Sequence, residues 1–189
     1  MVLTLCMAMG LTLYIYAEII CKGAVLARFD YRKISRGVVV FCLWQLAMIA
    51  VGAGAATFIE GLQDTEQMQE FTWIASVFIF IFLTVKMLHK AWKNESVEER
   101  REDVLIFKNV ITFSVGIGFR TMLIGFVLGF VEVNLVTAVI LFAFAAVTVF
   151  IAGLYSGYRL GYGHKTAAYI AAALCFMASG IYLIVAYFA

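Results

Sequence analysis

The chain has 189 residues, of which 65% are hydrophobic and only 14% are charged, whereas a soluble domain is about half apolar and a quarter charged. This composition excludes an ordinary soluble protein, and the small net charge of +2 gives no reason to expect a nucleic-acid partner. The motifs of zinc proteases, serine hydrolases and P-loop nucleotide-binding proteins are absent. We therefore predict neither an enzyme nor a cofactor.

The apolar residues form six long runs, each able to cross a hydrocarbon core about 30 Å thick as a helix of about 20 residues. In chain order the runs cover residues 2–27, 37–59, 71–91, 104–131, 135–158 and 166–188. They are long and do not alternate between polar and apolar positions, which favours helices over a membrane barrel. The sequence thus predicts an all-α integral membrane protein with six transmembrane helices.

Positive charges alternate between the connections. The first, third and fifth connections carry the cations Arg28, Arg32, Lys33, Arg36, Lys90, Lys93, Arg100, Arg101, Lys108, Arg159 and Lys165. The second has four acidic residues and no Lys or Arg, and the fourth is a tight turn with Glu132 and Asn134. The positive-inside rule places the basic connections in the cytoplasm. We predict a multi-pass protein of the inner (plasma) membrane with both termini on the non-cytoplasmic side.

The strongly charged segment 94–103 divides the chain into two halves of three helices, residues 1–93 and 104–189. Because three is odd, a repeat relating these halves must have inverted topology. Inverted repeats with a binding site near the midplane are a common design of transporters. We expect 94–103 to be a cytoplasmic linker between two inverted repeats.

Polar residues inside the apolar runs are costly in lipid and usually face the bundle interior or water. Arg120 lies about 18 Å into the fourth run by helical rise, near the midplane, and needs a partner. Glu18 is the only comparably deep carboxylate, so we predict a Glu18–Arg120 pair. Lys22, four residues after Glu18, could pair with it along the helix or extend to the inner interface.

Gln45, Thr121 and Tyr14 are the expected neighbours of this pair. Three interpretations are open at this stage: a structural ion pair that locks the bundle, a substrate or proton pathway, or separate residues extending to the interface. The glycine rows at 125–129 and 153–161 indicate close helix contacts.

Several stretches resemble the MntP-like manganese efflux pump family of the LysE-type transporter superfamily, and the resemblance covers nearly the whole chain. Residues 21–23 are similar to the S-K-G that closes the family's first-helix motif. Residues 41–54 are similar to its second helix, 123–134 to the end of its fourth, and 153–161 to its G-x-x-x-G-x-x-x-G. The resemblance implies a six-helix exporter.

The chain departs from the family at two positions. The family's motifs, similar to S-M-D-A and S-I-D-A, carry one aspartate in each half, implicated in cation transport. Tyr14 stands at the first position and Arg120 at the second. A fixed arginine would repel Mn²⁺, which needs several oxygen ligands as other hard divalent ions do. The resemblance therefore implies the fold without fixing the substrate, and no metal-ligand set is assigned.

The sequence favours a small secondary exporter of a cation or small solute that works by alternating access. We expect Glu18, Arg120, Gln45, Lys22, Tyr14 and Thr121 to line its pathway. Arg120 would bind an anionic or zwitterionic substrate, or would switch its pairing with Glu18 between states. The alternative is a non-transporting membrane scaffold or partner-binding subunit derived from a transporter fold. The expected partners are the lipid bilayer and a small ion or solute, with a homodimer or a membrane partner subunit left open.

Overall fold

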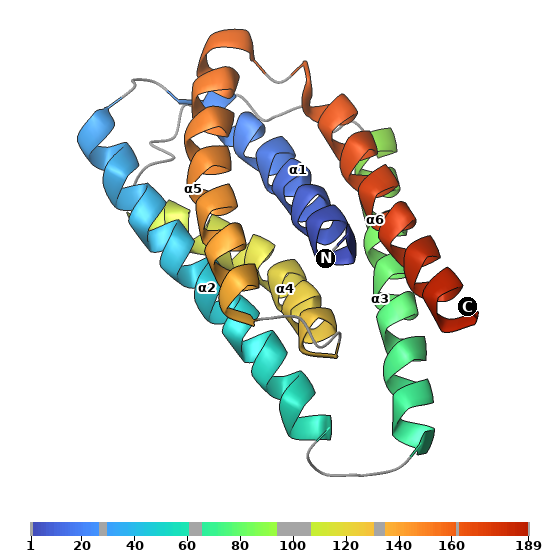
Figure 1. Cartoon of the computed structure of the whole chain (residues 1–189). Helices are drawn as coiled ribbons and strands as arrows, with labels where there is room; N and C mark the ends of the chain where they lie inside the picture. The colour runs from blue at the N-terminus through green and yellow to red at the C-terminus, as the bar shows by residue number, and fades with distance from the viewer. Residues whose placement is uncertain are drawn as a thin grey trace.

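The computed structural model consists of six helices (Figure 1). It describes residues 2–26, 30–60, 66–93, 107–130, 135–161 and 163–188. The helices are α1 (Val2–Ala24), α2 (Tyr31–Glu60), α3 (Glu66–Lys93), α4 (Phe107–Phe130), α5 (Leu135–Leu160) and α6 (Lys165–Phe188). All six are long and apolar enough to cross a membrane, and the described residues contain no strand. The predicted six-helix membrane fold is confirmed; the linker at 94–103 lies outside the described residues.

Two helices begin earlier than the apolar runs indicate. α2 starts at Tyr31 rather than at residue 37, and α3 starts at Glu66 rather than at 71. Asp30 explains the first case, because its carboxylate accepts a hydrogen bond from the Arg32 amide at 3.0 Å, the usual N-cap interaction. The polar residues that follow Asp30 are therefore helical although they are exposed to water.

The helices pack as interleaved pairs. α2 packs along α4, α1 lies between α5 and α6, and α3 packs along α6, while α3 and α4 barely touch. Figure 1 shows α2 and α3 on opposite sides of the bundle, with α1 and α4 between them. Large apolar side chains on the outer faces are exposed, among them Leu43, Phe78, Ile140 and Phe144, as expected where lipid tails cover a helix.

Glycine allows α1 and α5 to cross at backbone distance. A Cβ at Gly157 would overlap the carbonyl oxygen of Ile20 on α1. A Cβ at Gly23 would lie 2.6 Å from the carbonyl oxygen of Leu154 on α5. Gly153 also packs on Ile19 of α1. Gly161, the last glycine of the row, makes no such contact and instead ends α5 with a φ of 69°.

The crossing of α4 and α2 has the same design. A Cβ at Gly52 would overlap the carbonyl oxygen of Met122 on α4, and one at Gly125 would lie 2.5 Å from the carbonyl oxygen of Ile49 on α2. Gly129 lies against Ala56 further along. The expectation of close contacts therefore holds for Gly125 and Gly129, as it does for Gly153 and Gly157.

Candidate functional site

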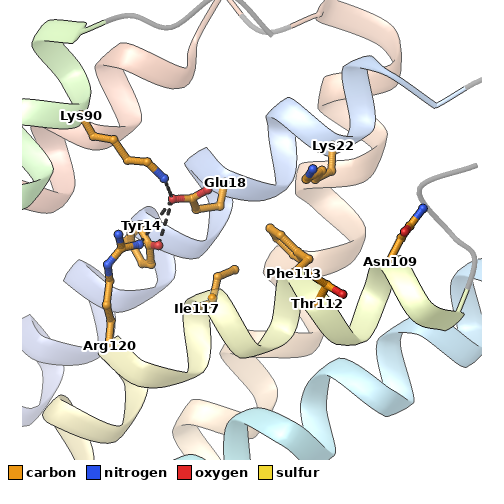
Figure 2. A pocket seen from close by; sticks show the side chains of 10 residues that line it. Tyr14, Glu18, Lys22, Lys90, Asn109, Thr112, Phe113, Ile117 and Arg120 are labelled. Carbon is orange, nitrogen blue, oxygen red and sulfur yellow. Dashed lines mark hydrogen bonds and ion pairs between the residues drawn. The ribbon is translucent and has the colours of Figure 1, made fainter. Parts of the chain in front are cut away.

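A cavity of about 470 Å³ lies between α1, α3 and α4. Its lining residues are Tyr14, Glu18 and Lys22 from α1, Lys90 from α3, and Asn109, Thr112, Phe113, Gly116, Ile117 and Arg120 from α4. The α1 residues recur every four positions and the α4 residues every three to four, so each helix presents one continuous face to the cavity. The cavity follows α4 for about three turns (Figure 2).

Glu18 is the centre of the polar contacts in this cavity. Its Oε1 atom accepts a hydrogen bond from the Tyr14 hydroxyl at 2.9 Å. The same oxygen forms ion pairs with Lys90 of α3 and with Arg120 of α4, the latter at 3.5 Å. Figure 2 shows these side chains turned toward the Glu18 carboxylate from three helices. The predicted Glu18–Arg120 contact is present, and Lys90 joins it.

Two tyrosine rings lie beside the cations. The Arg120 guanidinium carbon lies 4.5 Å from the centre of the Tyr14 ring. The Lys90 ammonium lies 5.5 Å from the centre of the Tyr169 ring on α6. A cation over an aromatic face gains about 0.5–2 kcal/mol, depending on how far it is desolvated. Each cation is therefore held by an aromatic ring as well as by Glu18.

Exposure increases from the middle of the bundle toward one end of the cavity. The side chains of Arg120 and Glu18 are 12% and 16% exposed, and that of Lys90 is 38% exposed. Lys22 is exposed and has no ion-pair partner among the described residues. The structure thus shows no Glu18–Lys22 ion pair, and extension of Lys22 to the inner interface stays a prediction.

Gln45 and Thr121 form a separate polar contact. The Thr121 hydroxyl lies 2.5 Å from Oε1 of Gln45, which joins α4 to α2. Both side chains are buried, and neither lines the cavity. The structure therefore brings four of the six expected pathway residues together in the cavity, and it places Gln45 and Thr121 together at the helix crossing behind it.

Sequence reasoning missed three polar lining residues: Lys90, Asn109 and Thr112. Lys90 was assigned to a cytoplasmic connection, although it lies within α3 and reaches back to Glu18. Asn109 and Thr112 could have been found from spacing, because they precede Arg120 by eleven and eight residues and share its helical face.

The site contains more cations than acidic groups. Its lining includes three basic side chains, Lys22, Lys90 and Arg120, and one carboxylate, Glu18. Among the described residues, no group of three or more His, Cys, Asp and Glu side chains is placed to hold a metal ion. The donors can form ion pairs and hydrogen bonds to a solute, and Glu18 can exchange its partners.

Comparisons with known proteins agree on one family. The family model described as "Putative manganese efflux pump" matches residues 28–184. A protein of Mannheimia succiniciproducens named "Putative manganese efflux pump MntP" is 25% identical over 175 residues, which cover 93% of this chain and 90% of that protein. A protein of the same name from Photorhabdus laumondii is 29% identical over 167 residues, covering 84% and 82%. No solved structure matches the chain.

Proposed function

This chain belongs to the "Putative manganese efflux pump" family, and from that premise we propose that it is a small secondary exporter working by alternating access. It moves an ion or small solute out of the cell through the cavity between α1, α3 and α4. The observation that carries the proposal is the cavity itself. Glu18 and Arg120 meet Lys90 there inside a bundle of six membrane-length helices, and ionisable groups as deep as Glu18 and Arg120 are usually functional.

The glycine contacts support an inverted repeat. Gly157 contacts Ile20 as Gly52 contacts Met122. A second pair of contacts joins the same helices, Leu154 to Gly23 and Ile49 to Gly125. Gly157 and Gly52 are as far apart in sequence as Leu154 and Ile49. The first helix of each half therefore crosses the second helix of the other half in the same register. A two-fold relation between halves that cross the membrane in opposite directions explains this agreement.

The same register relates Glu18 to Arg120. Glu18 and Arg120 are 102 residues apart, the same separation as Ile20 and Met122. In this relation the acid of one half meets the base of the other half at equivalent positions. The proposed two-fold axis then passes close to the ion pair. A solute bound there could be reached in turn from each side of the membrane.

The departure from symmetry supports alternating access. Gly10 of α1 packs on Phe176 of α6, whereas the equivalent residue of α4, Thr112, lines the cavity next to α3. α1 is thus closed against α6, while α4 stands away from α3. If α4 packed against α3 and α1 separated from α6, the present cavity would close. An equivalent cavity would then open on the opposite side of the membrane.

The direction of opening follows from charge. Lys22 and Lys90 lie toward the end of the bundle where α1 and α3 end and where α2 begins with Arg32, Lys33 and Arg36. Basic residues favour the cytoplasmic side. We propose that the cavity faces the cytoplasm and that both termini lie outside, in the plasma membrane.

One observation favours a second function, that of a non-transporting membrane scaffold or partner-binding subunit. The resemblance places Tyr14 and Arg120 where the family's motifs carry aspartates. In the structure these two residues contact each other and Glu18. A chain that had lost transport could retain such contacts as structural ones.

The ion and solute contents of cells that express the chain distinguish an exporter from a scaffold. Cells expressing the chain, its Arg120→Met variant or its Lys86→Met variant are compared with empty cells by elemental analysis, manganese included, and by mass spectrometry of small solutes. Lys86→Met is the matched control, because Lys86 lies on α3 outside the cavity lining. An exporter lowers at least one ion or solute in wild-type and Lys86→Met cells but not in Arg120→Met cells. Identical contents at equal expression would reject transport and favour the scaffold.

A further inference from the structure

The charges that line the cavity do not balance. Among the described residues that line it, Lys22, Lys90 and Arg120 contribute three positive charges and Glu18 contributes one negative charge. Coulomb repulsion between like charges in a partly desolvated site amounts to several kcal/mol at close range. An entering divalent cation would add two positive charges to this excess. An entering anion would reduce the excess, so the field of the cavity selects anions.

The basic groups converge on one point. Lys90 from α3 and Arg120 from α4 both contact Oε1 of Glu18, as does the Tyr14 hydroxyl. A guanidinium has five N–H donors and an ammonium has three, so each can bond a second acceptor. Figure 2 shows the two cations on either side of the carboxylate. Glu18 thus occupies the position that the carboxylate of a solute would take.

The cations do not depend on Glu18 alone for their position. Arg120 lies over the Tyr14 ring and Lys90 over the Tyr169 ring. If Glu18 turns away, the aromatic faces still hold both cations in place. A site that remains ordered without its internal carboxylate can accept an external one at low cost, because little rearrangement is needed on binding.

We propose that the cavity binds a small organic carboxylate, whose carboxylate group pairs with Arg120 and Lys90 in place of Glu18. Glu18 is then an internal competitor that keeps the site neutralised while no solute is bound. The volume of about 470 Å³ is within the usual range of small-molecule sites. The inference rests on the proposed export function and names the substrate class of that same cavity.

If Glu18 competes with the ligand, removing its charge changes the ligand affinity in a characteristic direction. For a carboxylate ligand, Glu18→Gln removes the competing group and should tighten binding about tenfold, because the fraction of protein with free cations rises. For a divalent cation, the same change removes the one carboxylate among the described lining residues and should weaken binding. A single substitution therefore distinguishes the two ligand classes by the direction of its effect.

The test uses the full chain, purified in detergent, with acetate, succinate, glutamate and MnCl2 as probes at constant ionic strength. Thermal unfolding is recorded against probe concentration. At least one carboxylate should raise the unfolding temperature of the wild type, and MnCl2 should not. Glu18→Gln should shift the half-saturating concentration about tenfold lower, Lys90→Met should shift it at least tenfold higher, and Lys86→Met should leave it unchanged.

The inference is overturned if no carboxylate stabilises wild type or Glu18→Gln. It is also overturned if MnCl2 stabilises the wild type and loses this effect in Glu18→Gln. If Glu18→Gln does not fold, the comparison of wild type with Lys90→Met decides, since Lys90 is the more exposed partner. Equal carboxylate affinity in those two proteins would also refute the proposal. Binding in detergent does not require transport. Carboxylate binding without export therefore rejects only the proposed export function. Manganese export without carboxylate binding rejects only the proposed carboxylate site.

Discussion

Removing both members of the Glu18–Arg120 pair should cost less stability than the sum of the two single removals. Their closest N–O distance is 3.5 Å, and two unit charges at that distance attract by about 5 kcal/mol at an effective dielectric constant of 20 and by about 1 kcal/mol in water. The side chains are 12% and 16% exposed beside a cavity, so the interaction lies between these limits. We expect a coupling of about 2 kcal/mol.

The assay is a double-mutant cycle of Glu18→Met, Arg120→Met and the double variant, followed by equilibrium unfolding with SDS in mixed micelles. Glu18→Met leaves Arg120 without its carboxylate partner in a mostly buried place and should lose about 2–4 kcal/mol of unfolding free energy. Arg120→Met should lose less, because Glu18 keeps its ion pair with Lys90. The double variant should recover about 2 kcal/mol of the summed losses. Losses that add within about 0.5 kcal/mol would show that the two residues do not interact, and the reasoning would fail.

Two further predictions concern the helix crossings. Gly52→Ala should cost about 1–3 kcal/mol of unfolding free energy, because its Cβ would overlap the backbone of α4. Gly54→Ala, whose Cβ would meet nothing within 4 Å, should be neutral or should stabilise by up to about 1 kcal/mol. Similar unfolding free energies for both variants would contradict the packing. Thr121→Val leaves the buried Gln45 Oε1 without its hydroxyl partner and should cost about 1–2 kcal/mol. Adding Gln45→Leu should restore part of that loss, and a further loss would argue against the hydrogen bond.

Hydropathy alone was sufficient to predict the six helices, because each apolar run is bounded by charged or turn-forming residues. It misplaced the start of α2, since hydropathy does not register a helix that continues into water from the Asp30 cap. The Glu18–Arg120 contact could be predicted because each residue is the deepest group of its charge and neither has another comparably deep partner in the sequence.

The rest of the site depends on how the helices cross. Lys90 lies near the end of α3, where a cation ordinarily extends toward water, and only the packing of both α1 and α3 against α6 brings it to Glu18. Gln45 and Thr121 were expected in the pathway, but the close α2–α4 crossing at Gly52 and Gly125 brings them against each other. Which polar side chains contact each other depends on how each helix is rotated about its axis. A single sequence does not determine this rotation.

The measurement that most directly tests the central claim, a water-filled cavity entered from the cytoplasm, is cysteine accessibility. Thr112→Cys is placed in the cavity wall and Val115→Cys on the exposed outer face of the same helix, each after replacement of the four native cysteines. A membrane-impermeant maleimide should label Thr112→Cys rapidly in everted vesicles and not in intact cells, and it should label Val115→Cys in neither. Labelling of Thr112→Cys only from the outside, or no faster than Val115→Cys in everted vesicles, would contradict the account.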